Sequence, residues 1–126
     1  MANAVTTEIA KKKILLARAG VYPLSKIAKM AFGTGGVDGA GNVLEIGEGQ
    51  QGLNAEIFRK DVDGYEIIND TKVQYRCTLT EEELAGEQLS ELALVDADGD
   101  FVAIKNFTAK GKDSDWKMTF KINDTM

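Results

Sequence analysis

The stretch from Glu91 to Ile104, ELALVDADGDFVAI, constrains the fold of this chain more than any other segment. Two runs of apolar residues flank the dipeptide Asp98-Gly99, and Asp-Gly between such runs is a strong signal for a tight turn joining two strands. A type I′ turn needs positive φ at both central positions, which these two residue types tolerate best. The segment therefore predicts a β-hairpin with its turn at Asp98 and Gly99.

One helix is predicted before the strands begin, over residues 4–19. Thr6 and Thr7 are candidate N-caps, Arg18 lies in the last turn, and Gly20 supplies a left-handed stop. The helix is short and amphipathic, so it is expected to pack on a sheet.

Alternation of apolar and polar residues predicts strands over much of the remaining chain. The predicted strands, besides the hairpin, are 25–32, 65–69, 71–79 and 116–122, with 53–60 as a strand or short helix. Residues 106–115 are expected to form a polar loop, and residues 124–126 to fray. The chain of 126 residues is expected to form one domain, residues 1–126, in which 53–122 are mostly β. The expected class is α+β, with one N-terminal helix on a mostly antiparallel sheet or small sandwich.

A glycine-rich stretch over residues 33–52 is predicted as a long flexible loop, interrupted by a candidate short strand at 43–46. A loop of this length is usually functional or disordered. The nucleotide-binding patterns do not fit, because no G-K-[ST] ending exists and Asp38 stands where G-x-G-x-x-G needs its third glycine. A plain loop is one interpretation, and a loop that orders on assembly is the other. The glycines in question are Gly33, Gly35, Gly36, Gly39 and Gly41.

This chain has few residues that are suited to enzyme catalysis. It has no histidine and one cysteine, Cys77, so the commonest general base is absent and no internal disulfide can form. Cys77 lies in a strand pattern and is interpreted as a small buried residue. Glu81, Glu82 and Glu83 are interpreted as exposed charge rather than paired catalytic carboxylates. The chain is therefore predicted to be no enzyme, with no catalytic residues, no cofactor and no metal.

Three acids in the hairpin turn, Asp96, Asp98 and Asp100, are spaced like the first ligands of a calcium loop. The pattern then fails, because Gly99 precedes the third acid and Phe107 stands where the bidentate Glu belongs. A turn is favoured, and a weak surface cation site is the alternative.

The charge is unevenly distributed along the chain. The net charge is −5, yet residues 1–30 carry six basic side chains and one acidic, which leaves nine basic and nineteen acidic for the rest. An acidic surface opposes nucleic-acid binding. The asymmetry favours head-to-tail or subunit contacts, with solvated faces as the alternative.

No apolar run is long enough for a membrane span or a signal-peptide core. The chain is therefore expected to be made in the bacterial cytoplasm, with no signal peptide and no membrane partner. Among the aromatic residues, Trp116 and Tyr65 are weak candidates for stacking on a ligand such as a sugar ring.

Several segments, in order, resemble the phage tail-collar fibre family. TTEIAKKKILLARAG is similar to the family's opening helix, KIAKMAFGTGG to its I-A-x-G-x-G strand and turn, and LNAEIFR to L-x-N-E-x-[YF]-R. RCTLTEEELAGEQLSELALVDADGDFVAI is similar to the strand, acidic turn and hairpin that follow. Two positions depart from the family pattern: Ala93 stands where glycine is frequent, and Thr34 where aspartate is. Family members are often longer, with fibre-forming regions after this domain.

The resemblance implies a virion structural protein that attaches a fibre to the tail or baseplate of a phage or prophage-derived particle and so serves host attachment. It also implies a homo-oligomer, with a trimer favoured, and partners among other phage tail or baseplate proteins. A carbohydrate-binding module for host surface glycans is the alternative function.

Overall fold

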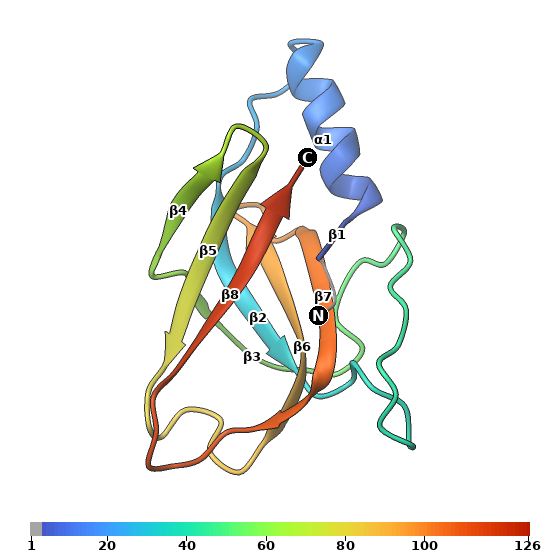
Figure 1. Cartoon of the computed structure of the whole chain (residues 1–126). Helices are drawn as coiled ribbons and strands as arrows, with labels where there is room; N and C mark the ends of the chain where they lie inside the picture. The colour runs from blue at the N-terminus through green and yellow to red at the C-terminus, as the bar shows by residue number, and fades with distance from the viewer. Residues whose placement is uncertain (1–3) are drawn as a thin grey trace.

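The computed structural model describes residues 4–126, which form two antiparallel β-sheets and one short helix (Figure 1). One sheet has the strand order β1-β7-β6-β2-β3, and the other has the order β4-β5-β8. The elements in chain order are β1 (Val5–Thr6), α1 (Glu8–Arg18), β2 (Ile27–Gly33), β3 (Glu56–Asp61), β4 (Gly64–Asn69), β5 (Lys72–Leu79), β6 (Gln88–Asp96), β7 (Phe101–Gly111) and β8 (Met118–Thr125).

The expected α+β class is wrong, because the chain is mostly β. Strands account for 48% of the described residues and helix for 9%. The helix has 11 residues, and only Ala10 among them is buried, so α1 covers too little of either sheet to form a layer. Among residues 4–126, no helix has both the length and the apolar composition needed to cross a bilayer.

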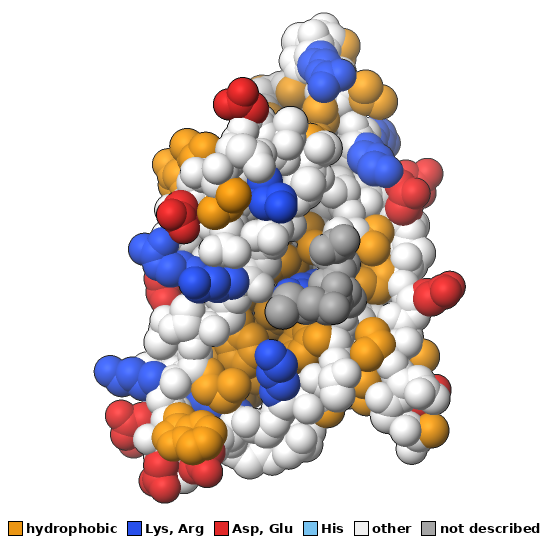
Figure 2. Space-filling view, viewed as in Figure 1, with side chains coloured by type: hydrophobic (Ala, Val, Ile, Leu, Met, Phe, Trp, Pro, Cys, Tyr) orange, Lys and Arg blue, Asp and Glu red, His pale blue; other side chains and the backbone are white. Residues whose placement is uncertain are grey.

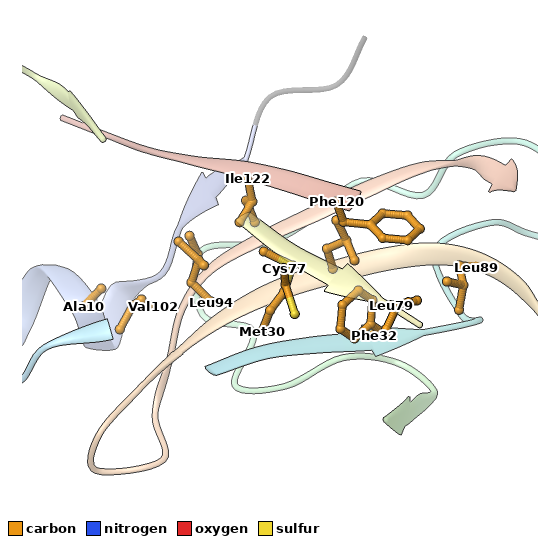
Figure 3. Close-up of a cluster of buried hydrophobic side chains, with 12 residues drawn as sticks. Ala10, Met30, Phe32, Cys77, Leu79, Leu89, Leu94, Val102, Phe120 and Ile122 are labelled. Carbon is orange, nitrogen blue, oxygen red and sulfur yellow. The ribbon is translucent and has the colours of Figure 1, made fainter. Parts of the chain in front are cut away.

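The main core lies between the two sheets, as Figure 3 shows. Met30 and Phe32 on β2 face Cys77 and Leu79 on β5, because alternate residues of each strand point to the same side. The ring of Phe32 meets the ring of Phe120 on β8 edge-on, with 5.5 Å between ring centroids. This arrangement buries the apolar side of each strand and makes the fold a sandwich.

A second, smaller core lies on the outer face of the five-stranded sheet. It contains Ala31, Ala93, Val95, Phe101 and Ile104, and the side chains that cover it are Ile46 and Leu53. Both covering residues come from the segment between β2 and β3. That segment, residues 34–55, therefore completes a hydrophobic core.

The expectation of a long flexible glycine-rich loop over 33–52 is therefore wrong. Gly33 is the last residue of β2, and Val37 forms an isolated bridge with Val43, where a short strand over 43–46 was expected. The backbone N–H of Leu44 donates to the carbonyl of Gly36 at 2.9 Å. Local hydrogen bonds and contacts with the sheet thus shape the segment that composition alone presents as a loop.

Helix α1 begins after a two-residue strand. Val5 and Thr6 pair with Ile104 and Ala103 of β7, so the chain is extended where the sequence suggested helix. Thr7 is the N-cap, and its hydroxyl accepts the backbone N–H of Ala10 at 3.3 Å.

The hairpin of β6 and β7 has a three-residue turn, not the expected type I′. Gly99 has a φ of 91°, whereas Asp98 does not have positive φ. The N–H of Gly99 donates to the carbonyl of Asp96 at 3.0 Å, and the N–H of Asp96 donates to the carbonyl of Asp100 at 2.9 Å. A type I turn followed by glycine in the left-handed region has this pattern.

Two expectations near the C-terminus are also wrong. Residues 106–115 were expected to be a loop, but β7 continues to Gly111, which pairs with Gln88 of β6. Residues 124–126 were expected to fray, but Asp124 and Thr125 pair with Val73 and Lys72 of β5. In both places the pairing with a long neighbouring strand outweighs the polar composition.

The thiol of Cys77 is expected to react only when the protein unfolds. It is fully buried, and burial, aided by the charge of Asp63, raises its pKa to about 11. At pH 8 the thiolate is therefore scarce in the native protein, and the rate with Ellman's reagent should be at least about a hundredfold lower than in urea. Equal rates in the native and unfolded protein would contradict the buried position.

Candidate functional site

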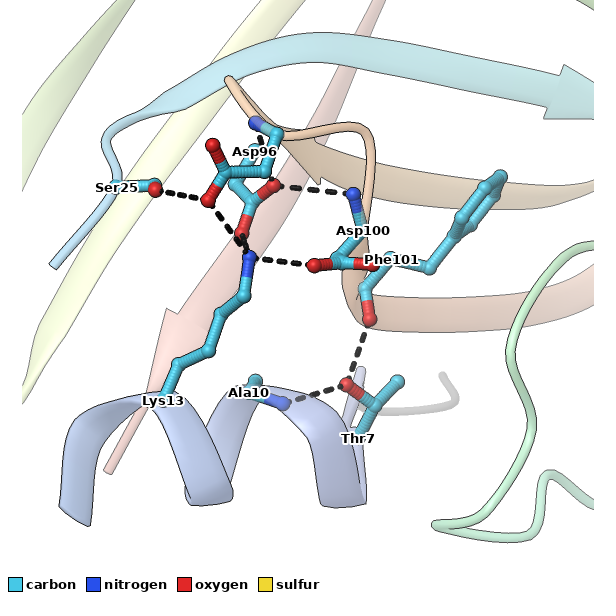
Figure 4. A network of polar contacts seen from close by, with 8 residues as sticks. Thr7, Ala10, Lys13, Ser25, Asp96, Asp100 and Phe101 are labelled. Atoms are coloured by element: carbon cyan, nitrogen blue, oxygen red, sulfur yellow. Dashed lines mark hydrogen bonds and ion pairs between the residues drawn. The ribbon is translucent and has the colours of Figure 1, made fainter. Parts of the chain in front are cut away.

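Lys13 of α1 lies at the centre of a cluster of three carboxylates from the β6–β7 turn (Figure 4). Its ammonium is 2.7 Å from Asp96 Oδ2, 3.1 Å from Asp98 Oδ2 and 2.5 Å from Asp100 Oδ2. Ser25, in the connection from α1 to β2, donates its hydroxyl to Asp98 at 2.5 Å. We call these five residues the lysine latch, because they tie the helix, the connection and the hairpin together.

Asp96 is the structural base of the latch. It is 3% exposed, and its Oδ1 accepts the backbone N–H groups of Asp98 and Asp100, both at 3.0 Å. One of its carboxylate oxygens thus shapes the turn, while the other binds Lys13. The hairpin aspartates therefore converge on the helix.

A second contact fixes the start of the helix beside the latch. The hydroxyl of Thr7 donates to the carbonyl of Phe101 at 2.7 Å, and the N–H of Thr7 donates to the carbonyl of Val102 at 3.1 Å. Thr7 is fully buried. Thr7 at the start of α1 and Lys13 in its middle thus both bind the β6–β7 hairpin.

The charges of the latch stabilise one another. Partial burial lowers the pKa of Lys13, but the hydrogen bonds that its ammonium donates to Asp100, Asp96 and Asp98 outweigh it, and the pKa is raised above its ordinary value. The hydroxyl of Ser25 and the ammonium of Lys13 lower the pKa of Asp98. Lys13 is therefore fully charged at neutral pH, and its ammonium occupies the position that a cation would take among these carboxylates.

The cation alternative can be judged from this geometry. The three aspartate oxygens lie within 4.8 Å of one another, but Lys13 already supplies them with a positive charge at hydrogen-bond distance. A metal would have to displace this ammonium, whose side chain is 20% exposed, and would place a second positive charge beside it. The arrangement suits an internal ion pair better than a metal site.

Replacing Lys13 by methionine is expected to lower the free energy of unfolding by about 2 kcal/mol at pH 7, because buried Asp96 loses its counter-charge. The raised pKa of Lys13 stabilises the folded state at every pH below about 10.4, the pKa of an unfolded lysine, and this stabilisation is lost as the pH rises through the folded pKa. The lowered pKa of Asp98 stabilises the folded state at every pH above about 3.9, the pKa of an unfolded aspartate, and this stabilisation is lost as the pH falls through the folded pKa.

The difference between wild type and variant should therefore be greatest between about pH 5 and 10, and shrink in acid. Urea unfolding across this pH range measures it. Lys12→Met, on the exposed side of the same helix, is the matched control and should change stability little. A pH-independent difference would contradict the electrostatic role of the latch.

A second polar site binds the segment 34–55 to β6 through a buried carboxylate. Glu91 is fully buried. Its Oε2 accepts the N–H groups of Gly35 at 2.9 Å and Ala55 at 2.8 Å, and its Oε1 accepts the N–H of Asn54 at 2.9 Å. One side chain therefore clamps both ends of the segment, and we call it the Glu91 clamp.

Three of the five candidate glycines lie at this clamp. A Cβ on Gly33 would be 2.4 Å from Glu91 Oε2, and one on Gly35 would be 2.7 Å from Asn54 Cβ. A Cβ on Gly36 would be 2.0 Å from the carbonyl oxygen of Ser90, whose hydroxyl accepts the N–H of Gly36 at 2.8 Å. These glycines permit the segment to lie directly on β6.

The other two candidate glycines lie in the outer part of the segment. A Cβ on Gly39 or Gly41 would meet nothing within 4 Å, although Gly41 has a φ of 85°. The turn around them is shaped by Asp38, whose carboxylate accepts the N–H groups of Ala40 and Asn42 at 2.9 Å. Hydrogen bonds from the backbones of Asn42 and Ala40 lower the pKa of Asp38. An assembly role for this part stays a prediction.

The two candidate stacking residues lie on different elements. Tyr65 on β4 is 62% exposed and packs beside Tyr75, with 6.0 Å between ring centroids. Trp116 is 63% exposed and lies in the connection from β7 to β8. Both rings are accessible, and a stacking role for either stays a prediction.

The uneven charge of the sequence is partly cancelled in space, because the basic helix α1 lies against the three aspartates of the β6–β7 turn. Residues 8–26, which form α1 and the turn after it, carry five basic side chains and one acidic. At the opposite end, the connections 80–87 and 112–117 meet, since the N–H of Gly86 donates to the carbonyl of Lys112 and the N–H of Lys112 to the carbonyl of Glu87 (Figure 1). Residues 80–87 carry four glutamates and no basic side chain.

The sequence did not single out Lys13, Ser25 or Glu91. Lys13 shares the inward side of the helix with Ala10 and Ile14, at the i, i+3 and i, i+4 spacing, which separates it from the neighbouring lysines. Glu91 alternates with small and branched apolar residues along β6. A charged residue in such a row indicates that its side chain has a buried partner, but the neighbouring sequence does not identify that partner.

Comparison with known proteins gives one family. The family model for the N-terminal domain of the phage tail-collar fibre protein matches residues 1–122. No curated protein and no solved structure matches this chain. The match spans nearly the whole chain and confirms the resemblance seen in the sequence. Its description indicates a structural role in a phage tail fibre and a place in the virion tail among other tail proteins. The chain therefore belongs to the phage tail-collar fibre protein family, as an N-terminal domain.

Proposed function

We propose that this domain attaches a fibre to the tail or baseplate of a phage or prophage-derived particle, as a homotrimer. The observation that carries the proposal is the family match over residues 1–122. Fibres are symmetric oligomers, and a rigid domain with fixed ends suits a connector. The lysine latch and the Glu91 clamp support this, because each ties distant segments into one body.

Two measurements test the proposal. Light scattering coupled to size exclusion, over a concentration series, is expected to give a mass three times the 13.7 kDa of one chain. Purified tail particles that lack this protein are expected to bind it in co-sedimentation. A monomer at every concentration would remove the trimer but leave attachment, whereas failure to bind tails would remove attachment itself.

A carbohydrate-binding module is the second candidate function, and the exposure of Trp116 and Tyr65 favours it. Exposed aromatic rings are suited to stacking on sugars. A glycan array probed with wild type and with Trp116→Ala and Tyr65→Ala tests it. Binding that either substitution abolishes would support a glycan role, and an array without signal would remove it.

A further inference from the structure

The β-sandwich is closed on one side and open on the other. On the closed side, Val62 and Asp63 connect β3 to β4, and their N–H groups donate to backbone carbonyls of β2 and β5. On the open side, the three-stranded sheet ends at β8, and the five-stranded sheet ends at the two-residue strand β1. Within residues 4–126, β8 pairs with β5 alone, and β7 from Asn106 onward pairs with β6 alone. Two strand edges that can accept a further strand therefore flank this side.

A groove of about 740 Å³ lies between these two edges. Its apolar lining includes Leu92, Phe107, Met118 and Phe120. Figure 2 shows hydrophobic side chains at the bottom of a hollow between β7 and β8, with basic side chains around it and acidic side chains toward the margins of the view. This volume and this mixed lining are typical of a binding site.

The groove is positively charged. Lys105, Lys110 and Lys121 line it, and among the described residues no carboxylate does. The ion pairs between residues of 4–126 do not include Lys110 or Lys121, and burial and the like charge of Lys110 lower the pKa of Lys105. Asp124 of β8 lines a different cavity, next to α1. The connection 112–117 carries two acidic and two basic side chains, so it adds no net charge.

The opposite edge of the three-stranded sheet is β4, whose apolar side chains are uncovered. Tyr65 is 62% exposed and Ile67 is 69% exposed, and every residue of β4 after the first is exposed. Glu66 alternates with these two side chains, and β4 has no basic residue. Lys72 and Arg76 on β5 lie opposite the two ends of β4. An exposed apolar edge strand of this kind is a template for pairing with another chain.

The exposed strand β4 and the groove complement each other. A strand that adds to β8 directs alternate side chains toward the groove and toward solvent. If β4 of another copy adds there, Tyr65 and Ile67 lie on the apolar lining. Glu66 then lies beside Lys121, which alternates with buried Phe120 on β8. Such an exposed pair adds little affinity, but it favours one orientation of the incoming strand.

Pairing of like edges fits these surfaces less well. Two β4 strands side by side would bring Glu66 of both copies together and leave the groove empty, and two β8 strands would bring Lys121 of both copies together. Either contact would also stop at a dimer, because the same surface is used by both copies. A contact of β4 with the groove uses two different surfaces, so three copies can close a ring.

We propose that β4 of one copy enters the groove between β7 and β8 of the next copy, and that three such contacts close the homotrimer. The edges of β4 and β8 pair through their backbones, and the apolar side chains of β4 are covered. This inference rests on the proposed homotrimer and adds the two surfaces that build it.

Light scattering coupled to size exclusion of the whole chain, over a concentration series, measures the contact. Tyr65→Ser with Ile67→Ser, the β4 variant, removes the apolar side chains of the incoming strand. Lys110→Glu with Lys121→Glu, the groove variant, places carboxylates where Glu66 arrives. Each variant is expected to need at least about tenfold more protein than wild type to form a trimer.

The matched control lies on the exposed side of α1. Lys12→Glu with Leu15→Ser reverses one lysine and removes one exposed apolar side chain, as the two variants do at the contact. Leu15 is 61% exposed, and both positions lie away from β4 and from the groove lining. This control should form trimers at the same concentrations as wild type.

An equimolar mixture of the β4 variant and the groove variant gives the sharper measurement. The β4 variant keeps an intact groove, and the groove variant keeps an intact β4, so one chain of each can form one contact but no ring. A dimer with one chain of each is expected at concentrations at which either variant alone is monomeric. Because an unfolded chain could not form this dimer, its appearance also shows that both variants are folded.

The other outcomes overturn the inference and separate it from the proposed function. Trimers of both variants at wild-type concentrations would place the three-fold contact on another surface and leave the homotrimer intact. A groove variant that stays trimeric while the β4 variant does not would show that β4 binds elsewhere. A mass that keeps rising with concentration would replace the ring by open columns. Wild type that is monomeric throughout would remove the homotrimer and the inference together, while co-sedimentation still tests attachment to tails.

Discussion

Replacing Glu91 by alanine is expected to lower the free energy of unfolding by about 3–5 kcal/mol, the largest effect of any single polar substitution in this chain. The carboxylate accepts three backbone N–H groups, from Gly35, Asn54 and Ala55. Alanine would leave these donors facing a cavity at a fully buried position. The penalty of unsatisfied donors then adds to the loss of charge-assisted hydrogen bonds.

Urea unfolding followed by far-ultraviolet circular dichroism measures the effect. Glu66→Gln, an exposed position on β4, is the control and should stay within about 0.5 kcal/mol of wild type. The stability of Glu91→Gln should lie between those of Glu91→Ala and Glu66→Gln, because glutamine keeps the volume of the side chain but turns an N–H₂ group toward backbone N–H donors. Limited proteolysis should cut residues 34–55 faster in Glu91→Ala, because the clamp holds both ends of that segment. Unchanged stability and unchanged cleavage would contradict the clamp.

The sequence predicts the β6–β7 hairpin correctly, because its signals are local: an Asp-Gly pair lies between two alternating runs. The sequence does not predict the turn type, since the choice between type I′ and a three-residue turn depends on the register of β6 against β7, which shifts between Leu94 and Val95. Local composition identifies a turn, while the pairing of whole strands decides its geometry.

The fold class was misjudged for a related reason. The helix pattern was clear, but eleven residues with one buried side chain make no layer. The polar stretch after Lys105 was assigned to a loop because it lacks apolar alternation, yet β7 runs to Gly111 beside β6. Residues 108–111 at the end of β7 are exposed on both sides of the strand, so no buried side imposes an apolar alternation there.

The lysine latch lay beyond what a single sequence offers. The sequence groups Asp96, Asp98 and Asp100 in a turn, which the structure shows, and a weak cation site there stays an untested alternative. Their partner Lys13 is 83 residues from Asp96. Three consecutive lysines gave no basis for choosing it until the helix was placed on the hairpin, where Thr7 and Ala10 fix which side faces inward.

Replacing Gly36 by alanine is the second large effect, with an expected loss of about 3 kcal/mol in the free energy of unfolding. The new Cβ would lie 2.0 Å from the carbonyl oxygen of Ser90 and 2.7 Å from its carbonyl carbon. Both are backbone atoms of a central strand, so no side-chain rotation can relieve the contact. The segment must move away from β6, which lengthens the hydrogen bonds of Gly36 to Ser90 and of Leu44 to Gly36.

Gly39→Ala is the matched control for this substitution. It lies in the same segment, and its Cβ would meet nothing within 4 Å, so stability should be unchanged or rise by up to about 1 kcal/mol through a less flexible unfolded chain. Thermal and urea unfolding of the two variants should therefore diverge, although composition alone gives both glycines the same role. Equal effects would mean that this segment is a loop free of β6, and that its glycines supply flexibility rather than close approach.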